Sequence, residues 1–226
     1  ARALIENGAD LEKQTKKGST ALILACQNGH EQCARALIEN GADLEKQQNE
    51  GWTALMYSAQ NGHEQCARAL IEAGAVVDTQ LPSGSTALIL AAQNGHEQCA
   101  RALIENGADL EKQQNEGWTA LMYSAQNGHE QCARALIEAG AVVDTQLPSG
   151  STALILAAQN GHEQCARALI ENGADLEKQT KKGNTALILA YQNGHEQCAR
   201  ALSTIRWIST AAARNSMPFR SKAVGA

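Results

Sequence analysis

The hydrophobic and polar positions of this chain of 226 residues repeat at a fixed interval. A threonine stands at positions 20, 53, 86, 119, 152 and 185, and the decapeptide NGHEQCARAL begins at positions 28, 61, 94, 127, 160 and 193. A second period of twice this length is superimposed, because residues 18–113 match residues 84–179 except for Cys26 against Ala92. A fixed period of this kind is typical of proteins built from stacked structural units.

Within one period, the pattern first predicts a short helix over residues 21–27. Thr20 is a good N-cap, because its hydroxyl can accept a hydrogen bond from a free backbone N–H of the first turn. Asn28 and Gly29 are expected to end the helix, since both residue types tolerate the left-handed conformation found at a helix C-terminus.

A second helix is predicted over residues 31–40, and Gly41 ends it. Glu31, Arg35 and Glu39 lie four residues apart, so they are expected to pair along the outer side of this helix. The apolar positions form one stripe of Cys33, Ala34, Leu37 and Ile38. Neither helix carries enough apolar surface to fold alone, so stacking of the units is expected to bury a continuous core.

This arrangement resembles the ankyrin repeat, whose unit has the same length of about 33 residues. The matching letters recur in every period and are, in one copy, Thr20-Ala21-Leu22-Ile23, Ala25, Gly29-His30, Leu37-Ile38 and Gly41-Ala42. The resemblance implies an all-α solenoid of stacked helix-loop-helix repeats, with β-hairpins or long turns between them. The sequence departs from the family pattern where Ala21 replaces proline and where Ile23 or Met56 replaces histidine. We expect apolar packing between repeats at the second of these positions.

The register divides the chain into an ankyrin-repeat domain over residues 1–202 and a tail over residues 203–226. Residues 1–16 form a partial repeat, which leads us to expect a piece of a longer protein. The whole repeats are 17–49, 50–82, 83–115, 116–148 and 149–181, and a truncated repeat covers 182–202.

The tail is basic, with Arg206, Arg214, Arg220 and Lys222 and no acidic residue. It contributes +4 to the net charge of −5 and so leaves −9 for the rest of the chain. Residues 203–209 either extend the last helix over the end of the stack or are disordered, and the sequence leaves both open. Beyond them we expect disorder.

The composition of the chain indicates which kinds of partner and which cellular location to expect. The mildly acidic charge makes nucleic acid an unexpected partner, and the chain has no run of 18 apolar residues that would predict a membrane span. The seven cysteines are not clustered as a disulfide framework would be, which favours a reducing compartment. We therefore expect an intracellular protein, in the cytoplasm or alternatively in the nucleus.

The sequence His30-Glu31-x-Cys33 raises the alternative of a metal site or a Cys/His enzyme. A structural zinc ion needs four ligands, whereas each unit offers two and the next copy lies about 10 Å away. Cys33 lies on the apolar stripe, where burial would keep it a thiol rather than a reactive thiolate. We therefore predict a framework role for the motif, no enzymatic activity, no metal and no cofactor.

Residues that differ between repeats indicate where a partner would bind. The resemblance implies binding through the hairpin tips and the concave face of the stack. By register, the candidate partner-binding residues are Asn49, Glu50, Trp52, Pro82, Ser83 and Ser85, with their copies Asn115, Glu116, Trp118, Pro148, Ser149 and Ser151. The sequence leaves open whether Trp52 and Trp118 are exposed anchors or pack on the neighbouring hairpin.

Together these observations predict a non-catalytic ankyrin-repeat scaffold that binds partner proteins, whose identity the sequence does not specify. No small-molecule ligand is predicted. One alternative is a spacer or regulatory cover for a catalytic domain outside this chain. The other is a Cys/His enzyme or metal site in the NGHEQC motif.

Overall fold

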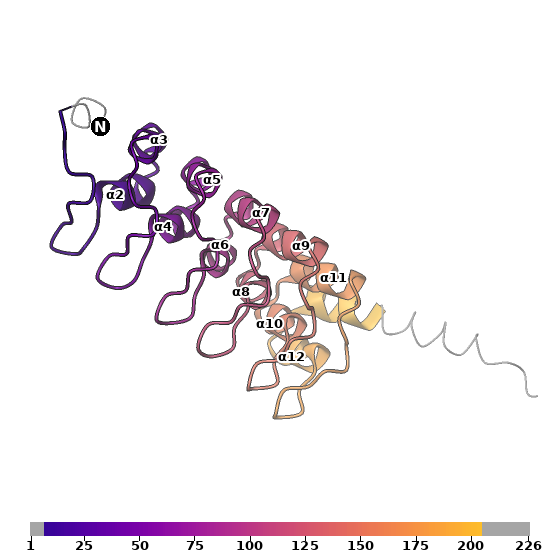
Figure 1. Ribbon diagram of the computed structural model, residues 1–226. Helices are drawn as coiled ribbons and strands as arrows, with labels where there is room; N and C mark the ends of the chain where they lie inside the picture. The colour runs from indigo at the N-terminus through magenta and orange to yellow at the C-terminus, as the bar shows by residue number, and fades with distance from the viewer. Residues whose placement is uncertain (1–6, 205–226) are drawn as a thin grey trace, which may run out of the picture.

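The computed structural model describes residues 7–204, which form one elongated row of stacked helical repeats (Figure 1). The first helices of successive repeats are α2 (Ala21–Gln27), α4 (Ala54–Asn61), α6 (Ala87–Asn94), α8 (Ala120–Asn127), α10 (Ala153–Asn160) and α12 (Ala186–Gln192). The second helices are α3 (Glu31–Glu39), α5 (Glu64–Glu72), α7 (Glu97–Glu105), α9 (Glu130–Glu138) and α11 (Glu163–Glu171), and residues 196–204 are helical in the last repeat. Residues 7–204 contain no strand, so the segments between repeats are long turns.

Each first helix begins at the threonine cap that the sequence predicted. In α2, the hydroxyl of Thr20 accepts a hydrogen bond from the N–H of Ile23 at 3.3 Å. The helix ends because Gly29 takes the left-handed conformation, with φ of 71°. Asn28 has φ of −103°, so the expectation that asparagine would share this conformation was wrong. Glycine supplies it alone because it has no Cβ to collide with the backbone.

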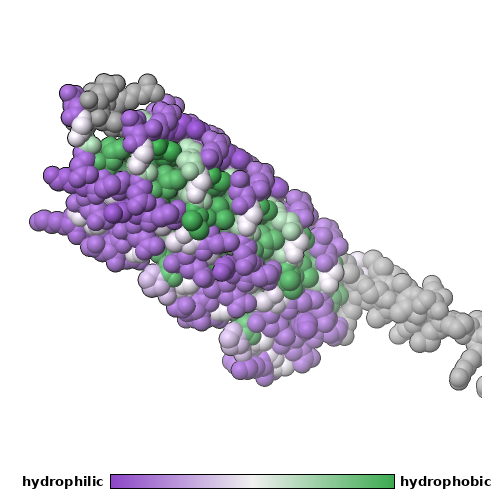
Figure 2. Space-filling view, viewed as in Figure 1, coloured by the Kyte–Doolittle hydropathy of each residue, from purple (hydrophilic) through white to green (hydrophobic). Residues whose placement is uncertain are grey.

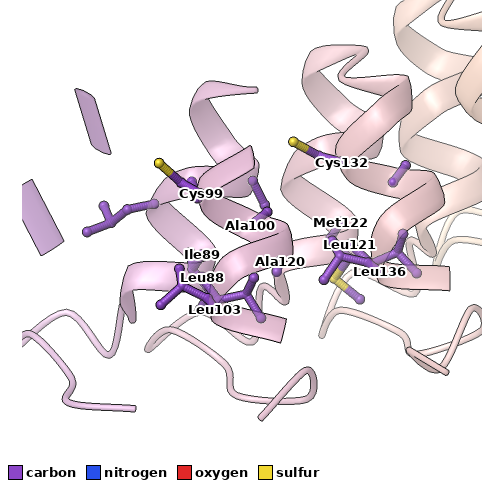
Figure 3. Close-up of a cluster of buried hydrophobic side chains, with 14 of the residues drawn as sticks. Leu88, Ile89, Cys99, Ala100, Leu103, Ala120, Leu121, Met122, Cys132 and Leu136 are labelled. Carbon is purple, nitrogen blue, oxygen red and sulfur yellow. The ribbon is translucent and has the colours of Figure 1, made fainter. Parts of the chain in front are cut away.

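The helices pack in two rows. Each first helix contacts the first helices of the adjacent repeats, and each second helix contacts the adjacent second helices. Leu88 and Leu103 of one repeat are buried beside Leu121 and Leu136 of the next, so the apolar stripes of separate repeats join into one core (Figure 3). Such burial contributes about 1.5–3 kcal/mol for each large aliphatic side chain.

Apolar packing replaces the usual histidine contact inside this core, as predicted. Ile23 and Met56 stand at the histidine position of two successive repeats, and each is only 1% exposed. An unbranched methionine side chain fills irregular space in a core well, which explains why isoleucine and methionine alternate here without changing the backbone.

The turns of successive repeats are tied together by carboxylates that recur once in every repeat. Glu12 accepts a hydrogen bond from the backbone N–H of Asp43 at 2.8 Å, and Glu45 accepts one from that of Val76 at 2.8 Å. The later copies of this contact are Asp78 to Asp109, Glu111 to Val142 and Asp144 to Asp175. These bonds hold the turns, which project together from one side of the stack (Figure 1).

The visible surface is hydrophilic over the projecting turns, and a broken hydrophobic band runs along the length of the stack (Figure 2). In the described part of the chain, no helix has the length and apolar character needed to cross a bilayer. Residues 203 and 204 belong to the last described helix. The remaining alternatives for the tail concern residues 205–226, which lie outside the described residues.

Candidate functional site

The decapeptide NGHEQCARAL serves the contact between repeats. From the second copy onward, the histidine ring reaches back to the glycine of the preceding repeat. A Cβ added to Gly95 would lie 2.5 Å from Nδ1 of His129, so no larger residue fits there without displacing the ring. Nε2 of His129 also lies 3.1 Å from the carbonyl oxygen of Gln93, so the imidazole joins two repeats.

Five of the six cysteines of the motif, from the copy at Cys66 to the copy at Cys198, are buried in the core, whereas Cys33 in the first copy is only half-buried. Cys99 and Cys132 are each 1% exposed, and burial raises the pKa of the first to about 12 and of the second to about 11. A thiol with such a pKa stays protonated at neutral pH and is a poor nucleophile. Within residues 7–204, no three His, Cys, Asp or Glu side chains are placed to hold a metal ion together.

The charged residues of the motif form a ladder across repeats. Arg35 pairs with Glu31 at 2.9 Å, as the helical spacing predicted. Its second partner is Glu72 of the next repeat at 3.4 Å, rather than the predicted Glu39 of its own helix. Glu72 is the copy of Glu39 one period later, so the prediction named the correct position in the wrong repeat. The same arrangement recurs at Arg68, Arg101 and Arg134.

Trp52 and Trp118 each stack on a tyrosine of the helix that follows. The ring centroids of Trp52 and Tyr57 are 4.9 Å apart with the planes 30° from parallel, and Trp118 and Tyr123 repeat this geometry. Both tryptophans are half-buried and pack against the hydrophobic core. Each tryptophan therefore packs on a tyrosine of its own repeat and still has exposed surface, and its role as an anchor for a partner stays a prediction.

The candidate asparagines at the turn tips also join neighbouring repeats. The side-chain amide of Asn49 donates to the carbonyl of Lys16 at 3.2 Å, and its backbone N–H donates to the carbonyl of Lys17 at 3.0 Å. Asn115 makes the corresponding bonds to Pro82 and Ser83. These bonds align successive turns, so an asparagine that looked like a contact residue has a structural task.

The other candidates differ in accessibility. Ser85 is half-buried, whereas its copy Ser151 is buried at 8% exposure and offers little surface to a partner. The hydroxyls within each serine pair, Ser83 with Ser85 and Ser149 with Ser151, lie 3.2 Å and 3.0 Å apart. The exposed candidates are Asn49, Glu50, Pro82, Ser83, Asn115, Glu116, Pro148 and Ser149.

A cleft of about 550 Å³ lies between the turns of the first two whole repeats. Its lining includes Lys16, Lys17, Gln48, Glu50 and Tyr57. Gln48 connects the aromatic and acidic sides of this cleft. Its side-chain oxygen accepts from the N–H of Glu50 at 2.9 Å, and its side-chain nitrogen donates to the hydroxyl oxygen of Tyr57 at 3.5 Å.

Tyr57 and Tyr123 belong to these aromatic contacts but are not among the candidate residues that the sequence predicted. The signal was the coincidence of two changes in the same repeats. Tyrosine replaces leucine only where tryptophan replaces serine five positions earlier. Two aromatic substitutions that always occur together indicate a contact between their side chains.

The family model that describes ankyrin repeats in three copies matches residues 1–81, 75–146 and 141–206. Among solved structures, the crystal structure of the human ASB11 ankyrin repeat domain is similar, with 28% sequence identity and a TM-score of 0.80. The match covers 90% of each chain. No curated protein sequence matches the chain.

Proposed function

Because the chain belongs to the ankyrin repeat family, whose domains are generally protein-interaction modules, we propose that it is a non-catalytic scaffold that binds partner proteins through its turn tips and concave face. The proposal is supported by the observation that the constant and the variable residues of the repeats have different tasks. The repeated decapeptide is committed to contacts between repeats, whereas the exposed residues that vary between repeats gather on the turns. Variable residues on a rigid scaffold are where binding concentrates.

Trp52 and Trp118 are the proposed anchors of this surface. Each is held by its tyrosine at a centroid distance of 4.9 Å, so little side-chain entropy would be lost on binding. Large aromatic side chains of this kind dominate the binding energy of many protein interfaces.

The test is quantitative affinity capture with the full chain and with the double variant Trp52→Ala and Trp118→Ala. The matched control is Val76→Ala with Val142→Ala, which also stand two repeats apart and are 55% and 54% exposed. We expect partners of the scaffold to be lost with the tryptophan pair and retained with the valine pair, both variants keeping the helical circular dichroism spectrum. Retention of all partners by the folded tryptophan variant would contradict the proposal.

We also propose an intracellular location, in the cytoplasm or nucleus, which is supported by the seven cysteines being free. Alkylation of the protein isolated from cells, without and with prior reduction, tests this. The same number of blocked thiols is expected in both samples, and intermolecular or intramolecular disulfides in the unreduced sample would oppose it.

A further inference from the structure

The aromatic pairs of the turn surface are each accompanied by a carboxylate. Glu50 and Tyr57 line the same cleft, and Gln48 contacts both. Burial, and secondly the charge of Glu50, raise the pKa of Tyr57, and Glu116 has the same effect on Tyr123. Each glutamate therefore lies close enough to its tyrosine for the negative charge to act on the tyrosine hydroxyl. We call the residues Glu50, Trp52 and Tyr57 the first acidic-aromatic site, and their copies Glu116, Trp118 and Tyr123 the second.

In the central repeats, positive charges do not balance the negative charge of these carboxylates. Residues 50–148 contain twelve Asp and Glu against four Lys and Arg, a net charge of −8. Three of the four basic residues are arginines that already pair with two glutamates each. Glu50 and Glu116 are exposed and form no ion pair with any residue of the described 7–204 segment. The surface is therefore complementary to positive charge.

The two sites are two repeats apart on one row of turns (Figure 1). Adjacent packed helices are separated by about 8–10 Å, so two repeats correspond to about 16–20 Å. An extended chain advances about 3.3 Å per residue. Residues about five or six positions apart in an extended partner would therefore reach both sites together.

Resting on the proposed binding function, we propose that the two acidic-aromatic sites bind two Lys or Arg side chains, about five or six positions apart, of one extended partner segment. A cation placed over a Trp or Tyr ring is attracted by the ring as well as by the carboxylate. Simultaneous binding at both sites strengthens the complex beyond either site alone, because the second contact forms within the first complex.

The two sites differ in what lies beside them. Lys16 and Lys17 line the same cleft as Glu50, whereas Pro82 and Ser83 stand at the corresponding positions next to Glu116. The lysines oppose the approach of another cation. The second site therefore contributes more to binding of the cationic segment than the first.

The test uses the full chain and fluorescein-labelled Gly/Ser peptides that carry two arginines six positions apart. Fluorescence anisotropy at low salt is expected to show binding that weakens as salt is raised. Glu116→Gln should weaken binding about threefold and Glu50→Gln less, the size typical of exposed charge contacts. The double variant should lose about fivefold or more.

The matched control is Asp43→Asn with Asp109→Asn, two exposed aspartates that also stand two repeats apart and whose side-chain oxygen accepts a backbone hydrogen bond that asparagine can keep. This variant removes the same charge and is expected to change affinity less than twofold. Equal losses for both double variants, or equal binding of a peptide with its arginines two positions apart, would overturn the inference. If natural partners depend on Trp52 and Trp118 but peptide binding ignores Glu50 and Glu116, the inference fails while the proposed function stands.

Discussion

The repeat over residues 149–181 and the truncated repeat over residues 182–202 match closely in sequence where they overlap, but they have very different surroundings. Ile155 of α10 is 1% exposed, whereas its copy Ile188 of α12 is 40% exposed. α10 lies between α8 and α12, but α12 has a first-helix neighbour on only one side within residues 7–204. The comparison shows that each interface is formed by the surfaces of two adjacent repeats. A residue at the interface is therefore buried only where the adjacent repeat is present.

The same rule holds at other positions of the two repeats. Ala158 of α10 is fully buried, and Tyr191 stands at its place in α12 with 63% exposure. An interior repeat has no room for a tyrosine ring at this position. The end of the stack therefore tolerates a residue that would separate two repeats anywhere else.

The largest difference between the interior and the end is expected for Ile155→Ala against Ile188→Ala. Removing the buried side chain leaves a cavity and should lower the free energy of unfolding by about 2–5 kcal/mol. The half-exposed copy should lose less than about 1.5 kcal/mol, because most of its methyl groups already contact water. Urea unfolding followed by circular dichroism measures both, and equal losses would show that α12 is as well covered as α10.

A smaller difference in stability is expected between Gly95→Ala and Gly194→Ala. Both glycines are left-handed, with φ of 76° and 74°, so both variants incur a backbone strain of about 1–2 kcal/mol. Only at Gly95 would the new Cβ also meet His129, whereas no described atom lies within 4 Å of that point at Gly194. Thermal unfolding should therefore show the larger loss for Gly95→Ala.

The collision can be isolated by combining Gly95→Ala with His129→Ala. If the ring causes the additional loss, the glycine substitution should cost less in the His129→Ala background than in the wild type. Additive effects of the two substitutions would instead show that the imidazole moves aside freely.

The smallest difference in the free energy of unfolding is expected between Arg101→Gln and Arg167→Gln. Arg101 bridges Glu97 and Glu138, whereas Arg167 pairs with Glu163 and the next position of the ladder is Thr204. Because these pairs are partly exposed, the interior variant should lose at most about 1 kcal/mol and the end variant less. Urea unfolding at low and high salt should show the difference shrinking as salt is added. A difference that persists at high salt would contradict an ionic origin.

The period, the helix limits and the caps were predictable because they depend on residues close together in the sequence. Thr20 binds the backbone three residues later, and Gly29 ends the helix through its own backbone conformation. The framework role of the decapeptide, which the structure shows in the later copies such as His129 and Cys132, followed from the same local register. The structural task of Asn49 was not predictable in this way, because its partner, Lys16, lies one full repeat away.

The sequence by itself determined the repeating unit, its family and the positions at which repeats differ. Only the tertiary structure decided that Arg35 pairs with Glu72, that Trp52 stacks on Tyr57, and that one copy of an identical isoleucine is buried while another is half-exposed. The physical reason is that the burial and the ion pairing of a residue depend on its own repeat and on the adjacent repeat that packs against it. A residue is enclosed by whatever packs on it, and in a stack of near-identical units the neighbour, not the residue, differs from one copy to the next.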